Sequence, residues 1–121
     1  PSYHVMRLYA HHFKPLPLQI LLSADAPDLF ACASETKSAV VIFGVNSANE
    51  PVKASFQFSG FAKPIQVASA EAVCDTLDAR QPDVMNHWNV LTRVSTRPLE
   101  PASNEVIIPA FSVVAIECAA F

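Results

Sequence analysis

The side chains in this chain that could perform chemistry are four histidines, a few neighbouring carboxylates and one tryptophan. The histidines are His4, His11, His12 and His87. His11 and His12 are adjacent, so on a helix they would point about 100° apart and could not readily share a metal. His4 and His11 would lie on one face of such a helix, but no carboxylate is at chelating spacing from them. The pattern therefore predicts no metal site, and a role at the surface or between domains is the better interpretation of these residues.

Two pairs of acidic residues, Glu71 with Asp75 and Asp75 with Asp78, have the chemistry of a glycosidase acid and nucleophile. No apolar pocket is evident around them that would keep one carboxyl group protonated, so we interpret them as part of a solvated, charged loop. Serine and cysteine occur without a nucleophile-elbow or Cys–His signature, and the chain's 2 glycines cannot form a phosphate- or dinucleotide-binding loop. The sequence therefore predicts no catalytic residue and no cofactor.

The most ligand-like cluster surrounds the only tryptophan, Trp88, which is flanked by Asn86, His87 and Asn89. An exposed indole ring can stack on the C–H face of a sugar, while the neighbouring amides can hydrogen-bond to its hydroxyl groups. The alternative is that Trp88 caps the open end of the fold, because large aromatic side chains are mostly buried for packing. We name Trp88, Asn86 and Asn89 as candidate sugar contacts, with this alternative left open.

The composition describes one folded domain. The 121 residues are 51% hydrophobic and 16% charged, with a net charge of −3, which suits a single core rather than a disordered chain. Basic residues are scattered singly, so no nucleic-acid partner is predicted. The longest apolar run, Ala39 to Val45, is too short to cross a membrane. No signal peptide opens the chain, and Pro1 in place of a methionine predicts that the chain was either processed or cut from a longer protein, of which we favour the second.

The cysteines Cys32, Cys74 and Cys118 are odd in number and match no zinc-binding spacing. Cys32 and Cys118 lie in apolar, strand-like segments, where a free cysteine behaves as a small hydrophobic residue. We therefore interpret all three as buried thiols. A disulfide between two of them is the alternative.

The stretch Ser38–Asn46 organises the rest of the chain. Of its 9 residues, 6 are Val, Ile, Phe or Ala, with no charge and no proline. It is short and rich in β-branched residues, which is typical of a strand that is buried on both faces. We predict that it is the central strand of an all-β core.

The remaining patterns predict a short helix followed by further strands. Tyr3–Phe13 places Val5, Leu8, Tyr9 and either His12 or Phe13 on one stripe at helical spacing, with a strand as the competing interpretation. Apolar or alternating runs bounded by turn residues predict strands over Leu18–Leu22, Leu29–Ser34, Val52–Phe58, Ile65–Val73, Val90–Ser95, Asn104–Ile108 and Phe111–Cys118. Asp75–Asn89 is predicted to be a structured loop and Pro98–Pro101 a linker. About eight short strands predict a two-sheet antiparallel sandwich, with a short N-terminal helix.

Several segments resemble the C-terminal region of α-L-arabinofuranosidases in which a (β/α)8 barrel is joined to a β-sandwich. PSYHVMRLYAHHF is similar to the last barrel helix of such enzymes, and the stretch from Leu29 to Phe61 is similar to the first strands of their sandwich. MNHWNVLTRVSTRP is similar to a passage late in that domain, although Leu91 stands near where the family pattern has proline. VIIPAFSVVAIEC resembles the closing strand, through Pro109, Ser112 and the apolar residues that follow.

The resemblance implies that residues 1–14 are the last helix of a catalytic barrel, or a linker, and that residues 15–121 are a β-sandwich domain. The parent enzyme would cleave arabinofuranosyl groups from plant polysaccharides by a retaining mechanism, with both catalytic carboxylates on the barrel. The chain itself would be a non-catalytic accessory domain that packs on the barrel through an apolar face. An independent carbohydrate-binding module and an Ig-like interaction domain are the alternatives.

Overall fold

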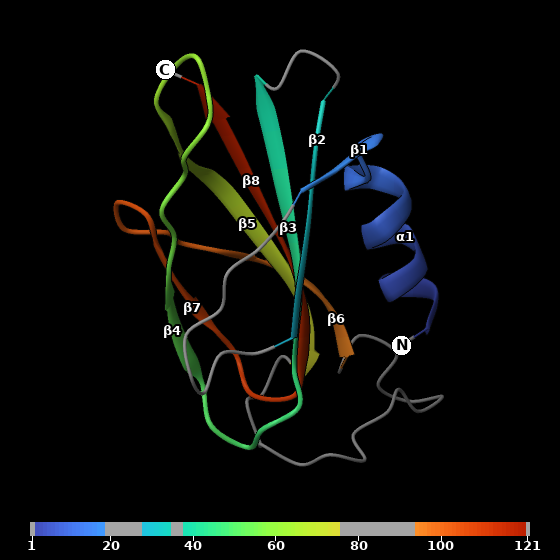
Figure 1. Ribbon diagram of the computed structural model, residues 1–121. Coiled ribbons are helices and arrows are strands. Elements are labelled where there is room, and N and C mark those ends of the chain that lie inside the picture. The colour runs from blue at the N-terminus through green and yellow to red at the C-terminus, as the bar shows by residue number, and fades with distance from the viewer. Residues whose placement is uncertain (1, 19–27, 35–37, 76–93, 121) are drawn as a thin grey trace.

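A six-stranded antiparallel sheet forms the body of the protein, with a helix on one face and a two-stranded sheet on the other (Figure 1). The computed structural model describes residues 2–18, 28–34, 38–75 and 94–120. Their elements in chain order are α1 (Ser2–His12), β1 (Leu16–Leu18), β2 (Asp28–Ala33), β3 (Ala39–Asn46), β4 (Val52–Ser55), β5 (Ile65–Asp75), β6 (Val94–Leu99), β7 (Glu105–Ile108) and β8 (Ser112–Ala120).

The larger sheet has the strand order β1-β2-β3-β8-β5-β6, and β4 pairs with β7 in the smaller sheet. Every pairing between these strands is antiparallel. The predicted two-sheet antiparallel sandwich with eight strands and an N-terminal helix is therefore confirmed. The two sheets are unequal within the part of the chain that the structure describes, because six strands lie in one and two in the other.

The predicted central strand is confirmed as β3, which pairs with β2 on one side and with β8 on the other. Its side chains alternate between the two faces of the sheet, and both faces are covered. Val40 and Ile42 belong to the core between the two sheets, whereas Val41 and Phe43 belong to the core beneath α1. A strand with two buried faces needs apolar residues at every position, which is the pattern that its sequence carries.

The predicted N-terminal helix is also confirmed, and the competing strand interpretation of this segment is wrong. The helix buries Leu8 and His12 and half-buries Val5 and Tyr9, so one stripe at helical spacing faces the sheet. Pro15 follows soon after the helix ends, where a ring without an N–H cannot continue it. No helix among the described residues is long and apolar enough to cross a membrane.

Some strand boundaries differ from those predicted. β4 ends at Ser55, although Phe56 and Phe58 continue the alternation and pack against the core as non-strand residues. The predicted strand Leu18–Leu22 overlaps β1 only at Leu18, and its remainder lies outside the described residues.

The predicted linker at Pro98–Pro101 is wrong at its start, because β6 continues to Leu99 and Pro98 pairs with Glu71. Proline is tolerated there because β6 is an edge strand among the described residues, and an edge strand has outward N–H groups without a partner strand. Most of the predicted Asp75–Asn89 loop, together with residues 90–93, lies outside the described residues. Asp75 itself is the last residue of β5.

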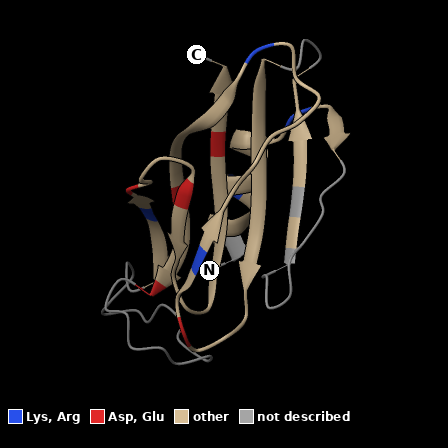
Figure 2. Cartoon of the chain, turned by 60° about the vertical axis from the view of Figure 1, so that its left-hand side comes forward, with Lys and Arg blue, Asp and Glu red and all other residues tan. Residues whose placement is uncertain are grey.

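All three cysteines are buried and free, which confirms their interpretation as buried thiols over the disulfide alternative. Burial, helped by the negative charge of Glu117, raises the pKa of Cys118 to about 12. Charged residues are scattered over the described part of the chain and do not gather into one patch of a single sign (Figure 2). Lys53 on β4 and Glu105 on β7 form an exposed ion pair at 3.0 Å, a type of contact that contributes little to stability.

Candidate docking surface

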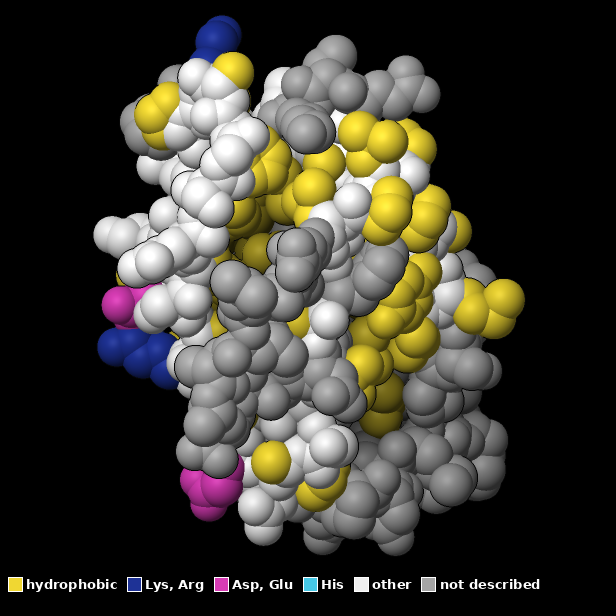
Figure 3. Space-filling view, in the orientation of Figure 1, with side chains coloured by type: hydrophobic (Ala, Val, Ile, Leu, Met, Phe, Trp, Pro, Cys, Tyr) yellow, Lys and Arg dark blue, Asp and Glu magenta, His cyan; other side chains and the backbone are white. Residues whose placement is uncertain are grey.

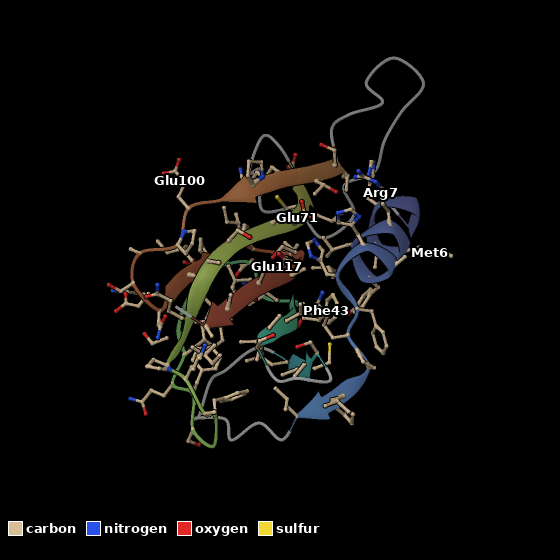
Figure 4. The ribbon with its side chains drawn as sticks, turned by 90° about the horizontal axis from the view of Figure 1, so that it is seen from above. Met6, Arg7, Phe43, Glu71, Glu100 and Glu117 are labelled. Atoms are coloured by element: carbon tan, nitrogen blue, oxygen red, sulfur yellow. The ribbon has the colours of Figure 1, made fainter. Side chains whose placement is uncertain are left out.

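The outward side of α1 carries an apolar stripe of three residues, Met6, Ala10 and Phe13, which we call the outer stripe. Met6 is 71% exposed and Phe13 is 59% exposed. Their i, i+4, i+7 spacing places them on one helical face, and the Phe13 amide donates to the Tyr9 carbonyl at 2.9 Å, so the helical turn extends to Phe13. Figure 4 shows Met6 pointing away from the sheet. More than half of the surface of each of these two large apolar residues is therefore open to solvent among the described residues.

The outer stripe is unusual for this surface. Only four large hydrophobic side chains are exposed among the described residues, and the other two are Val45 on β3 and Ile107 on β7. Two of the four therefore lie on one short helix. Hydrophobic side chains are visible on the side of the molecule that carries α1 and also in the hollow at the centre of the same view (Figure 3). Contiguous exposed apolar patches on folded proteins mark sites of interaction with other molecules.

The inward side of α1 fixes the helix on the sheet and so positions the outer stripe. Leu8 is 2% exposed and enters the core with Phe43 and neighbouring residues of the sheet. The Tyr9 ring stacks on Phe43, with 4.5 Å between ring centroids and 30° between planes. After the helix, the Lys14 amide donates to Cys32 Sγ at 3.3 Å. These contacts orient α1 so that its outer stripe faces away from the sheet.

A polar contact at the C-terminal end of α1 adds to these apolar contacts between the helix and the sheet. Both ring nitrogens of His12 meet a carboxylate: Nε2 lies 2.6 Å from Glu71 Oε1 and Nδ1 lies 2.7 Å from Glu117 Oε1. Glu71 comes from β5 and Glu117 from β8, two strands that are paired in the sheet. We call these three residues the histidine clamp. His12 is only 8% exposed, so it does not lie at the surface, which was one of the two roles expected for the histidines; it lies between α1 and the large sheet.

The electrostatics of the clamp favour a charged ring. Burial by itself lowers the pKa of His12, but the hydrogen bonds to Glu71 and Glu117 and their negative charges outweigh it and raise the pKa above 6.5. Burying an unpaired charge costs a large free energy, so buried charges in proteins are paired with an opposite charge. The His12 imidazolium, with a carboxylate on each side, is such a paired charge.

This arrangement does not have the geometry of a sugar-cleaving site. Glu71 lies on a strand, not in the predicted solvated loop, and both carboxylates are hydrogen-bonded to one buried ring. The pocket beside the clamp has a volume of about 50 Å³, whereas sites for small-molecule ligands occupy about 300–1,000 Å³. The described residues contain no group of three or more His, Cys, Asp or Glu placed to hold a metal ion.

The candidate sugar contacts lie outside the residues that the structure describes. Trp88, Asn86 and Asn89, together with His87 and Asp78, lie in the range 76–93 that the structure does not describe, so their assignment stays a prediction. Among the other histidines, His4 is half-buried and His11 is exposed, and both lie on α1. Sequence reasoning missed Glu117 altogether, although a single carboxylate in the otherwise uncharged run Ser112–Ala120 was a usable signal.

The fold defined here, an antiparallel sandwich with a helix on its larger sheet, occurs in solved α-L-arabinofuranosidases of family 51. The enzyme from Xanthomonas axonopodis pv. citri matches 98% of this chain with a TM-score of 0.62 and 17% identity. The enzyme from Bifidobacterium longum matches 88% with a TM-score of 0.58 and 20% identity. The enzyme from Thermotoga petrophila matches 74% with a TM-score of 0.51 and 20% identity. The resemblance found in the sequence is thus confirmed at the level of fold.

The match covers only part of each neighbour. This chain spans 26%, 21% and 18% of the lengths of the Xanthomonas, Bifidobacterium and Thermotoga enzymes. It therefore has the fold of one domain of those larger chains. No protein-family profile and no curated protein sequence matches it.

Proposed function

We propose that this chain is a non-catalytic C-terminal accessory domain of an α-L-arabinofuranosidase-like glycoside hydrolase that acts on arabinose-containing plant polysaccharides. Its partner is the catalytic (β/α)8 barrel of the parent chain, with residues 1–14 as the connection and residues 15–121 as the sandwich. The single observation that carries the proposal is the outer stripe on α1, because this helix is buried on its inner side and still presents Met6 and Phe13 on its outer side. The fold shared with part of the family 51 enzymes supplies the class of partner.

The role of the domain follows from the two sides of α1. The inner side makes the helix part of the sandwich core through Leu8 and Tyr9. The outer stripe then gives the rigid sandwich an apolar face with which to cover apolar surface on the barrel. Fully burying one Met or Phe side chain contributes about 1.5–3 kcal/mol, so the stripe is suited to keep the two domains assembled. The chain contributes no catalytic carboxylate in this account, because those residues belong to the barrel.

Charge substitutions in the outer stripe test the proposal. The barrel encoded before Pro1 and the 121-residue chain are made as two polypeptides and mixed, and their affinity is measured by calorimetry. We expect a complex that Met6→Asp and Phe13→Asp each weaken by roughly ten- to a hundredfold, because each loses the burial energy of one large apolar side chain. Hydrolysis of an aryl α-L-arabinofuranoside by the complex, and none by the chain alone, is the expected activity.

Ile107→Asp is the matched control for these variants. Ile107 is 62% exposed, as accessible as the stripe residues, but it lies on β7 in the small sheet, across the large sheet from α1 (Figure 1). We expect this variant to bind the barrel as the unmodified chain does. Equal weakening by all three substitutions, or none by the two stripe variants, would contradict docking through α1.

A further inference from the structure

The histidine clamp is a charged contact between α1 and the large sheet. Its hydrogen bonds depend on how many protons the His12 ring carries. An ionised carboxylate can only accept hydrogen bonds, and a neutral imidazole can donate from one nitrogen only. His12 meets Glu71 through Nε2 and Glu117 through Nδ1. Both contacts are hydrogen bonds only when the ring carries two protons and a positive charge. Deprotonation of His12 removes one of the two and leaves a carboxylate facing a lone pair.

Among the described residues, no second buried cation lies beside the His12 ring to replace its charge. The titratable groups of the described residues that face His12 are Glu71 from β5, Glu117 from β8, and Arg7 and His11 from its own helix. Arg7 and His11 line the small pocket on the Glu71 side and are themselves exposed. The His11 ring meets the His12 ring edge to face at 5.2 Å between centroids.

We propose that the histidine clamp is a pH-sensitive latch, in which the His12 imidazolium holds the last turn of α1 on β5 and β8 and its deprotonation loosens that turn. The outer stripe is carried by the same helix, and Phe13 follows His12 directly. Loss of the latch therefore also disturbs the docking surface. This second consequence rests on the proposed docking function, whereas the latch itself does not.

The direction of the effect follows from the pKa of the ring. The carboxylates raise the pKa of His12 in the folded chain above its ordinary value of 6.5, against the lowering effect of burial. A group whose pKa is raised by folding stabilises the folded state fully below its unfolded pKa. That contribution is lost as the pH rises through the higher, folded pKa. The last turn of α1 is therefore held firmly in mildly acidic solution and loosens in alkaline solution.

Two NMR measurements on the 121-residue chain test the latch. The first follows the His12 ring signals through a pH titration, and we expect a midpoint above 6.5. The second measures hydrogen-exchange protection of the Phe13 amide, which donates to Tyr9 within the last turn. From about pH 6 to about pH 9, after correction for intrinsic exchange, we expect protection to fall by about tenfold for each unit by which folding raises the pKa.

Three kinds of variant separate the latch from other causes. Glu71→Gln and Glu117→Gln are each expected to lower the titration midpoint of the His12 ring, because each removes one negative partner. His12→Gln is expected to give low protection of the Phe13 amide that no longer follows pH, while His11→Gln keeps the pH dependence of the unmodified chain. Three results would overturn the latch. The first is a titration midpoint of His12 at or below 6.5. The others are a midpoint that neither Glu71→Gln nor Glu117→Gln changes, and protection of the Phe13 amide that does not change as His12 titrates. Each of these results leaves the docking proposal standing, because barrel binding is measured separately.

Discussion

Replacing Phe43 by alanine is expected to lower the free energy of unfolding by about 3–5 kcal/mol, the usual cost of removing a buried phenylalanine side chain. Phe43 is 1% exposed at the middle of β3 and carries the stack with Tyr9 that seats α1. The variant creates a cavity beneath the helix and removes the ring contact together. Urea unfolding measures the effect as a shift of the midpoint at constant slope.

Phe13→Ala is the matched control, because it deletes the same side chain at a site that is 59% exposed. We expect it to change the unfolding free energy by no more than about 0.5 kcal/mol. Together the two substitutions distinguish a phenylalanine buried beneath α1 from one on the outward side of the helix. A loss below about 1 kcal/mol for Phe43→Ala would mean that the helix is not seated on β3 as described.

Asn46→Asp is expected to destabilise the chain by about 3 kcal/mol, since the buried carbonyl of Pro109 and the partly buried carbonyl of Glu50 both lose their donor, and an unsatisfied buried group costs about 1–3 kcal/mol. Asn46 is 3% exposed, and its Nδ2 donates to the carbonyl oxygens of Glu50 and Pro109, each at 3.0 Å. Its Oδ1 accepts from the Ala48 amide at 3.1 Å. Asp keeps this acceptor and nearly the same shape, but as a carboxylate it has no proton to donate. The variant therefore measures the two donated bonds, which tie the end of β3 to the chain before β4 and before β8.

Asn49→Asp provides the comparison for this substitution, since Asn49 is an exposed residue of the same connection. We expect its effect on thermal unfolding to stay within about 0.5 kcal/mol. If both substitutions shift the unfolding temperature equally, the amide of Asn46 is not the tie between these segments. The measurement then reports only the added negative charge.

Local patterns were sufficient to predict most of the fold. β3 was predictable because a strand with two covered faces is apolar at successive positions, and this stretch combines that pattern with several β-branched residues. The helix was predictable from the spacing of Val5, Leu8 and Tyr9, and the structure decides between His12 and Phe13 for the next inward position in favour of His12. Pro98 was read as a linker because sequence alone does not show which strand lies at a sheet edge.

The candidate site was less predictable, because it depends on contacts between distant parts of the chain. His12 is 59 residues from Glu71 and 105 from Glu117, and their meeting depends on the order of strands in the sheet. A single carboxylate in an otherwise uncharged strand was the available signal at Glu117, since a charge is placed there only with a partner. β5 carries a second carboxylate besides Glu71, so that strand offered no such signal. The outer stripe was likewise hidden, because Met6 and Phe13 look like core residues until the inner face of α1 is known.

The most direct test of the central claim, that this sandwich serves a catalytic barrel in the same protein, is to sequence the coding DNA on the 5′ side of the Pro1 codon. Our account predicts one continuous reading frame of at least about 250 codons, with alternating strand and helix patterns and two catalytic carboxylates near strand ends. An initiation codon directly before Pro1 would contradict it. So would an upstream segment without strand–helix alternation.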